Sequence, residues 1–265
     1  MSRMKFEGLL ENEFTLSDKV LRSKNGTDSG VIDVPVENLI LDEENITIFG
    51  DFNQDSIDSL SKDIENDGFK GTILAYPIRK DGDLQFYQIE SGHKRYLAAK
   101  QAGLKKVPVI VTEIPKSDAE RRLRLISMNL HTRETPKPSI LANEAAILLN
   151  SIRELREEEG LSTDMTTLTQ LVAERMERST KAIEKYRQFK KLIPKLQDLA
   201  DEGASWSALV NCSSLSPERQ EMIAFKIRNE AETVGVENIS RQWILNLIAK
   251  ARNEELGEID IIPPK

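Results

Sequence analysis

The stretch Ser91-Gly-His-Lys-Arg95 has the residue types that bind an anion. A small residue and a glycine end a predicted strand, Leu84 to Glu90, and a helix rich in Ala, Leu and Lys follows at once. The turn therefore places unbonded backbone N–H groups, the positive end of a helix dipole and two cations, Lys94 and Arg95, at one point. Phosphate is the anion most often bound in this way. The alternative is an ordinary strand-to-helix turn with a solvated basic first turn, because such turns are frequent in α/β proteins.

The segments around this turn predict a compact α+β unit over residues 31–112. Strands alternate with helices and hairpins, and the Asp81-Gly82 pair is typical of a hairpin turn. Apolar residues at helical spacing, together with capping residues and glycines, mark the helices. The predicted strands lie within Val31 to Leu41, Ile73 to Arg79, Leu84 to Glu90 and Val107 to Val111, and the predicted helices are Asn53 to Asn66 and the segment from the turn to Gly103.

From Ser117 onward the pattern is helical almost to the end, which predicts an all-α second part. Within it, Thr166 to Lys191 predicts two short helices joined by a tight turn, with the small Ala173 where they pack. Ser179 is placed to cap the second helix, whose apolar residues repeat on one face. This arrangement is typical of a helix-turn-helix, and the alternative is an αα-hairpin with a solvated basic face.

Charge is unevenly distributed along the chain. The formal net charge is −7, yet the segment Arg175 to Lys195 has eight basic and two acidic residues, a net charge of +6. A basic island in an acidic protein indicates a local nucleic-acid contact. We therefore predict that the second helix enters the major groove of double-stranded DNA. The predicted DNA-binding residues are Thr169, Gln170, Arg178, Ser179, Thr180, Lys181, Lys185 and Arg187.

Composition argues against a membrane-spanning, secreted or disulfide-bonded protein. The 265 residues are 31% charged and 39% hydrophobic, which suits a soluble, helix-rich protein. No apolar run approaches the roughly 20 residues that a membrane span needs, and residues 1–13 lack the apolar core of a signal peptide. The single cysteine, Cys212, excludes an internal disulfide and favours a reducing compartment. We expect a cytoplasmic protein with no membrane partner.

With these features together the sequence resembles the ParB family of chromosome and plasmid partition proteins, collinearly from about Val31 to Arg219. Phe52 to Arg79 resembles the first nucleotide-binding segment of that family, whose glycine, loop and strand read here as Gly68 to Arg79. Ser91 to Ala99 resembles its Gly-Glu-Arg-Arg-x-Arg-Ala-Ala box. Met128 to Glu134 resembles its Glu-Asn-x-x-Arg box. Leu168 to Gly203 is similar to its helix-turn-helix and the helix that follows. The order and spacing of these boxes carry the resemblance.

The resemblance implies an α+β N-terminal domain of the ParB/sulfiredoxin-like fold, followed by an all-α helix-turn-helix domain. It implies a homodimer that binds a DNA site, takes up CTP with Mg²⁺ and closes into a sliding clamp on DNA. A ParA-type ATPase would be its partner, at the nucleoid or on a plasmid. By position, the nucleotide-binding residues would be Gly71, Thr72, Ser91, Gly92, His93, Lys94, Arg95, Asn129 and Arg133, and Asn129 would also help to bind the metal.

Four positions depart from the family pattern. His93 stands where the family has Glu, and Met128 stands where it has the acidic residue of Glu-Asn. Gly71-Thr72 replaces Gln-Pro, and Glu177 replaces a turn glycine. The lost carboxylate at Met128 removes a metal ligand or a water-orienting group. We therefore expect nucleotide binding with at most weak hydrolysis.

The expected domains are an N-terminal arm (1–30), a nucleotide-binding domain (31–135), a DNA-binding domain (136–235) with its helix-turn-helix at 168–190, and a C-terminal helix and tail (236–265) for oligomerisation. Two other functions stay open. One is a transcriptional regulator of a mobile element, built from the same parts without a clamp. The other is a ParB-like nucleotide-dependent phosphotransferase, which needs a carboxylate base, for which Glu90 is the nearest candidate. Sulfiredoxin chemistry needs a cysteine at the turn, and Ser91-Gly92-His93 has none.

Overall fold

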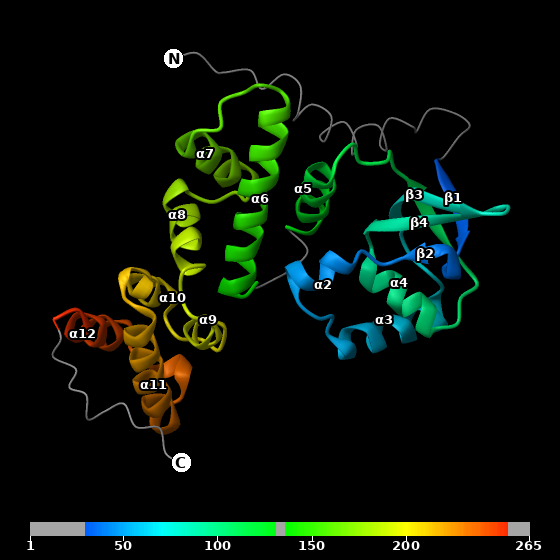
Figure 1. The fold of residues 1–265 in the computed structure, drawn as a ribbon. Coiled ribbons are helices and arrows are strands. Elements are labelled where there is room, and N and C mark those ends of the chain that lie inside the picture. The colour runs from blue at the N-terminus through cyan, green and yellow to red at the C-terminus, as the bar shows by residue number, and fades with distance from the viewer. Residues whose placement is uncertain (1–29, 131–135, 254–265) are drawn as a thin grey trace. The chain divides into compact units, whose positions relative to one another are not determined.

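The computed structural model describes residues 30–130 and 136–253 (Figure 1). These residues divide into two compact units, the first made of residues 30–46 and 51–114 and the second of residues 47–50, 115–130 and 136–253. The division after Ile114 differs from the domain boundary expected at residue 135. Residues 1–29 of the predicted arm, and the tail after Asn253, lie outside the described residues.

The first unit is built on a five-stranded mixed sheet with the strand order β1-β5-β3-β4-β2. β3 and β4 form an antiparallel hairpin, β5 runs parallel to β3 and antiparallel to β1, and β2 runs parallel to β4. Pro35 ends the edge strand β1, where its missing N–H costs no ladder hydrogen bond. The strands are β1 (Val31–Pro35), β2 (Leu39–Ile40), β3 (Ile73–Asp81), β4 (Leu84–Ser91) and β5 (Lys106–Val111).

Two helices, α3 (Gln54–Asp67) and α4 (His93–Gln101), share one hydrophobic core with this sheet. Asn53 begins α3, because its side chain accepts a hydrogen bond from the backbone N–H of Ser56. Ile64 of α3 and Tyr96 of α4 are buried together with central strand residues. The core therefore fixes the turn between β4 and α4.

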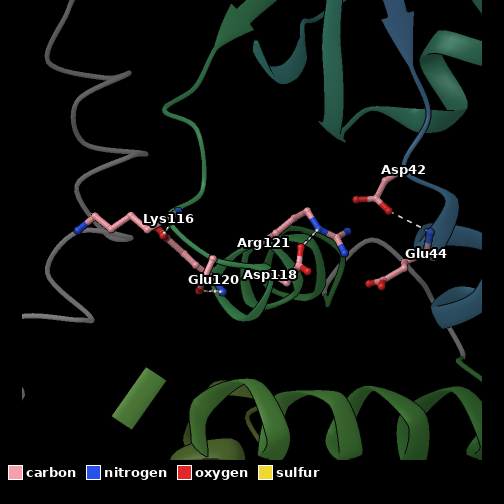
Figure 2. Close-up of polar contacts among 7 residues, drawn as sticks. Asp42, Glu44, Lys116, Asp118, Glu120 and Arg121 are labelled. Carbon is pink, nitrogen blue, oxygen red and sulfur yellow. Dashed lines mark hydrogen bonds and ion pairs between the residues drawn. The ribbon is translucent and has the colours of Figure 1, made fainter. Parts of the chain in front are cut away.

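A further helix, α2 (Glu43–Phe49), has no counterpart in the sequence prediction. The Asp42 carboxylate begins it by accepting a hydrogen bond of 2.9 Å from the backbone N–H of Glu44 (Figure 2). The helix spans the division of the chain, since its residues up to Ile46 belong to the first unit and its last turn belongs to the second. Seven residues are too few for apolar periodicity to reveal a helix.

The described part of the second unit is helical throughout. The long helix α6 (Pro138–Glu158) packs against α5, α7, α8 and α9. The α+β domain followed by a helical domain, predicted from the sequence, is confirmed. No described helix is long and apolar enough to span a membrane. The other helices are α5 (Asp118–Asn129), α7 (Met165–Arg175), α8 (Thr180–Phe189), α9 (Pro194–Asp201), α10 (Trp206–Leu209), α11 (Pro217–Val234) and α12 (Arg241–Arg252).

The C-terminal segment expected to stand apart from residue 236 onward belongs, over its described part, to the same core. Ile244, Ile248 and Ala251 of α12 are buried in the hydrophobic cluster that α6 and α8 also form. Trp206 of α10 stacks on Tyr186 of α8, with ring centroids 5.3 Å apart. The helices after α8 therefore support the position of α8 itself.

Candidate functional site

The turn between β4 and α4 has the conformation of an open helix N-terminus. Gly92 is the N-cap of α4 and has a φ of +98°, which lies in the left-handed region. A Cβ at this position would lie 3.3 Å from Cγ1 and 3.4 Å from Cα of Ile73, so a glycine is needed there for two separate reasons. No described side chain caps this helix, and its first N–H groups therefore remain available to an anion.

Arg95 joins this turn to the loop before β3. Its Nη1 donates a hydrogen bond of 2.5 Å to the backbone carbonyl of Thr72, and burial lowers the pKa of the guanidinium. Gly71 has a φ of +86°, and a Cβ there would lie 2.8 Å from Nη1 of Arg95. The structure thus brings Gly71, Thr72, Gly92 and Arg95 together. Lys94 is exposed beside them.

His93, which was predicted to bind nucleotide, is the first residue of α4, and its imidazole is buried. Its side chain is only 4% exposed and stacks on Phe52, with ring centroids 6.2 Å apart. The amide Nδ2 of Asn45 lies 3.3 Å from Nδ1 of His93, within hydrogen-bond distance. Burial lowers the pKa of His93 to about 4, although the Asp42 carboxylate opposes the shift. A buried neutral imidazole cannot supply a cation to a phosphate.

Glu90, the carboxylate considered for phosphotransfer, is buried as well. Its Oε2 accepts a hydrogen bond of 2.5 Å from the hydroxyl of Thr112, just after β5. The register of β3 and β4 shifts at this point, with Leu74 opposite Ser91 and Ala75 opposite Ile89. Glu90 therefore belongs to a buried polar contact within the sheet, not to the exposed turn.

The third predicted nucleotide segment lies on the second unit. Asn129 is the last residue of α5, and its Nδ2 donates a hydrogen bond of 2.7 Å to the carbonyl of Leu125. Figure 2 shows the polar start of the same helix, where the Glu120 carboxylate accepts from the backbone N–H of Lys116. Arg133 lies outside the described residues. In residues 30–130 and 136–253, no group of three His, Cys, Asp or Glu side chains is placed to hold a metal.

The second candidate surface is formed by α7 and α8, which pack on each other. A four-residue turn joins them, and in this turn Glu177 has a φ of +52° while the N–H of Arg178 bonds to the carbonyl of Ala173. The Ser179 side chain then accepts from the N–H of Ala182 and begins α8. Ile183 of α8 is fully buried. The sequence prediction of two helices joined by a tight, capped turn is therefore confirmed.

Most of the predicted DNA-binding side chains lie on the surface of this pair. Thr169 is the exception, because it is only 4% exposed and faces the helical core. Lys195, at the end of the basic segment, pairs with Glu221 of α11 at 2.8 Å. Gln170, Arg178, Ser179, Thr180, Lys181 and Lys185 are exposed, and Arg187 is half-buried.

Other contacts were not predicted from the sequence. Asn45 and Phe52 surround His93, and Arg175 donates a hydrogen bond to Ser127 of α5. These partners are 41 to 48 residues apart in the chain. A local sequence pattern carries no signal for such distant pairs.

The fold and these two surfaces define a protein with an α+β domain, in which an uncapped helix N-terminus lies beside Lys94 and Arg95, and a helical domain that has a cationic face. Residues 22–129 match the family described as the ParB N-terminal domain. Over these residues the chain is similar to ParB proteins, and the match spans the first unit and helix α5.

Two curated relatives have related sequences. The chain is 34% identical, over 91 residues, to the chromosome-partitioning protein ParB of Myxococcus xanthus, a stretch that covers 34% of this chain and 28% of that protein. It is 26% identical, over 203 residues, to the probable chromosome-partitioning protein ParB of Rickettsia conorii, covering 76% of this chain and 62% of that protein. The chain thus spans less than two thirds of the length of these relatives.

A solved structure has the same fold. The C-terminally truncated chromosome-partitioning protein ParB from Caulobacter crescentus, complexed to the centromeric parS site, matches with a TM-score of 0.51 and 20% identity. The match covers 83% of this chain and 99% of that one. It therefore extends over both units of the chain.

Proposed function

We propose that this protein is a ParB-like DNA-binding protein of chromosome or plasmid partition, or of nucleoid organisation. In this proposal α7 and α8 form a helix-turn-helix that binds a specific DNA site. A nucleoside triphosphate at the turn before α4 switches a homodimer into a DNA clamp. The exposed cationic face of α8 is the observation that carries the DNA-binding part, and the uncapped N-terminus of α4 supports the switch.

DNA binding follows from the charge and exposure of α8. Lys181 and Lys185 are one helical turn apart and exposed, while Ile183, Tyr186 and Phe189 anchor the opposite face. A helix held in this way can present cations to phosphates without losing its packing. Each neutralised phosphate releases counterions and steepens the dependence of affinity on salt concentration.

The test of this part compares Lys185→Ala with Lys195→Ala, because both remove one positive charge from the basic segment. Lys185 is exposed on α8, whereas Lys195 pairs with Glu221. Lys185→Ala should weaken DNA binding and lower the slope of log affinity against log salt by about 1, and Lys195→Ala should leave the slope nearly unchanged. Equal slopes for Lys185→Ala and the unmodified protein would exclude α8 from the DNA interface. A loss that depends on DNA sequence would identify a base contact.

The geometry of the first unit supports nucleotide binding. The N–H groups at the start of α4 would bind phosphate oxygens, and Lys94 and Arg95 would neutralise their charge. Gly92 lets the backbone approach, and Arg95 holds the Gly71–Thr72 loop in place. The resemblance to the family selects CTP with Mg²⁺, and Asn129 would help to bind the metal. The two lost carboxylates of the family pattern, at His93 and Met128, favour binding with weak or no hydrolysis.

A titration with CTP, ATP, GTP and UTP, with and without DNA, tests the nucleotide. Lys94→Ala and Arg95→Ala should each weaken the preferred nucleotide about tenfold or more, since hydrogen bonds to charged groups contribute roughly 1.5–3 kcal/mol. Lys94→Ala should do so at unchanged thermal stability, because Lys94 is exposed. Unchanged affinity in both variants would show that the nucleotide binds elsewhere or not at all. The affinity for DNA without nucleotide should be mostly unchanged in both variants.

The second candidate is a regulator of a mobile element in which the nucleotide changes DNA affinity without entrapment. The departures at Met128 and Glu177 from the family pattern favour keeping this candidate. Closed circular DNA distinguishes the two functions, because only a clamp stays on a closed circle in high salt while it leaves linear DNA. A ParA-type ATPase as partner, and a location at the nucleoid or on a plasmid, are parts of the partition proposal.

The phosphotransferase alternative loses its base, because Glu90 is buried and bonded to Thr112. Incubation with labelled nucleotide provides the check. Rapid phosphoryl transfer that Glu90→Ala abolishes would restore this alternative.

A further inference from the structure

The side chains of α8 divide into a buried face and an exposed face. Ile183, Tyr186 and Phe189 are buried in the helical core. Glu184 and Gln188 are exposed, and their spacing of four residues places them on one side of the helix. Because an α-helix turns by about 100° per residue, this side lies opposite the buried face. Glu184 and Gln188 therefore lie along the middle of the exposed face.

The exposed cations of α8 surround these two side chains. Lys181 precedes Glu184 by three residues on the same side, whereas Lys185 lies toward one edge of the exposed face and Arg187 toward the other. A helix in the major groove directs the middle of its exposed face at base edges and its borders at the flanking phosphates. The positions of Lys185 and Arg187 thus fit phosphate contacts, and those of Glu184 and Gln188 fit base contacts.

Glu184 is the one acidic residue of α8. In residues 30–130 and 136–253, no hydrogen bond or ion pair involves its side chain, although Lys181 and Lys185 are near it in the sequence. A carboxylate that is not paired within the protein repels phosphates, so it weakens binding to DNA of any sequence. It stabilises a complex only opposite a hydrogen-bond donor.

In the major groove the donor that a Glu side chain selects is the N4 amino group of cytosine. Adenine also has an amino group there, but its N7 acceptor would face the same carboxylate. Glu184 can therefore favour a site with cytosine and disfavour other DNA, which is how specificity arises from a repulsive as well as an attractive contact.

Gln188 has a different chemistry from Glu184. Its amide can donate and accept, and its side chain has no hydrogen bond within the part of the chain that the structure describes. Such an amide pairs with N6 and N7 of adenine. The four residues between Glu184 and Gln188 correspond to a rise of about 6 Å, or about two base pairs at roughly 3.4 Å each.

We propose that Glu184 and Gln188 are the specificity-determining residues of α8, and that Glu184 selects a cytosine and Gln188 an adenine about two base pairs away. The inference rests on the proposed function and deepens it. It adds two residues that the predicted DNA-binding set does not contain, and it names the bases that they select.

Selection from a pool of DNA duplexes with a randomised segment tests the two assignments. The unmodified protein should enrich one sequence. Glu184→Ala should lose the preference for cytosine at one base pair and keep the other preferences, and Gln188→Ala should lose the preference for adenine at another. Glu232→Ala is the control, because it removes the same charge from an exposed position on α11.

The affinities for the enriched duplex and for a duplex of scrambled sequence give the size of the effect. Their ratio should fall roughly 5- to 150-fold in Glu184→Ala, as for the loss of one correct base pair. It should stay within about twofold in Glu232→Ala. Glu184→Ala should also bind the scrambled duplex more tightly than the unmodified protein does, because a repulsive charge is removed.

An unchanged sequence preference and ratio in Glu184→Ala would refute the role of Glu184, and the same result in Gln188→Ala would refute that of Gln188. A preference lost at a base other than cytosine or adenine would overturn the assignment of the bases. If the unmodified protein enriches no sequence, the specific DNA site of the proposed function is itself refuted.

Discussion

The protonation state of His93 decides whether its side chain can take part in the proposed nucleotide site. Burial lowers its pKa to about 4, against an ordinary value of 6.5. Between these two values the unfolded chain binds a proton that the folded chain does not, so the folded state loses stability as the pH falls from 6.5 toward 4. At about 1.4 kcal/mol for each pH unit, this pKa difference corresponds to roughly 3 kcal/mol. Above pH 6.5 the contribution of His93 to stability is constant.

The pKa of His93 can be measured directly, because the chain has only two histidines. NMR titration of the imidazole protons should show one resonance that shifts near pH 4, and His93→Gln should remove it. In parallel, the stability advantage of the unmodified protein over His93→Gln should shrink by roughly 3 kcal/mol between pH 7 and pH 4. Nucleotide affinity between pH 6 and pH 8 should be the same in both proteins apart from ordinary phosphate titration.

A pKa of His93 at or above 6.5 would refute the buried neutral imidazole. So would a nucleotide affinity that rises below pH 7 in the unmodified protein and not in His93→Gln. Either result would return His93 to the phosphate site, where the sequence had placed it.

The remaining predictions concern backbone strain and the single thiol. Gly92→Ala should destabilise the first unit by more than the control Gly103→Ala. The left-handed penalty of about 1–2 kcal/mol applies to both, because Gly103 has a φ of +71°, but only the Cβ added at Gly92 contacts Ile73, since no described atom lies near the Cβ added at Gly103. Equal losses of stability in thermal unfolding would contradict this contact. Glu177→Gly should raise the stability of the helical unit by up to about 1 kcal/mol, because the φ of Glu177 is +52°. Urea unfolding monitored by tryptophan fluorescence measures this change. A lower unfolding midpoint in the variant would show that the Glu177 side chain contributes more than the backbone strain costs. Cys212 is buried, and burial raises the pKa of its thiol to about 12. The thiol should therefore react with a thiol reagent only when the protein unfolds. Fast labelling of the native protein would contradict this prediction.

Local signals in the sequence predicted most element boundaries. Ser179 caps the helix that it was expected to cap, because a cap bonds only two or three residues away. The strand-to-helix turn at Gly92 was also visible, since a glycine between a strand and a helix marks a left-handed N-cap position. The spacing of the basic residues correctly predicted which face of α8 is exposed.

Side-chain direction was predicted less well wherever it depends on a distant partner. His93 and Thr169 are polar residues in polar stretches, yet both are buried. Arg175 is one of eight cations in its segment, and nothing in the sequence reveals its contact with Ser127. Helix α2 was missed for a different reason, because its seven residues are too few for apolar periodicity to reveal a helix.

The sequence by itself determined the order of an α+β part and a helical part, the glycine turn before α4 and the cationic helix, because caps, glycines and apolar periodicity act within a few residues of the chain. Only the tertiary structure decided that Arg95 holds the Gly71–Thr72 loop, that His93 is a neutral core residue, and that Arg175 joins α7 to α5. Each of these depends on two segments, 23 to 48 residues apart, that come together only when the core is packed. Burial and hydrogen bonding between distant segments then set which polar side chains face a ligand and which stabilise the fold.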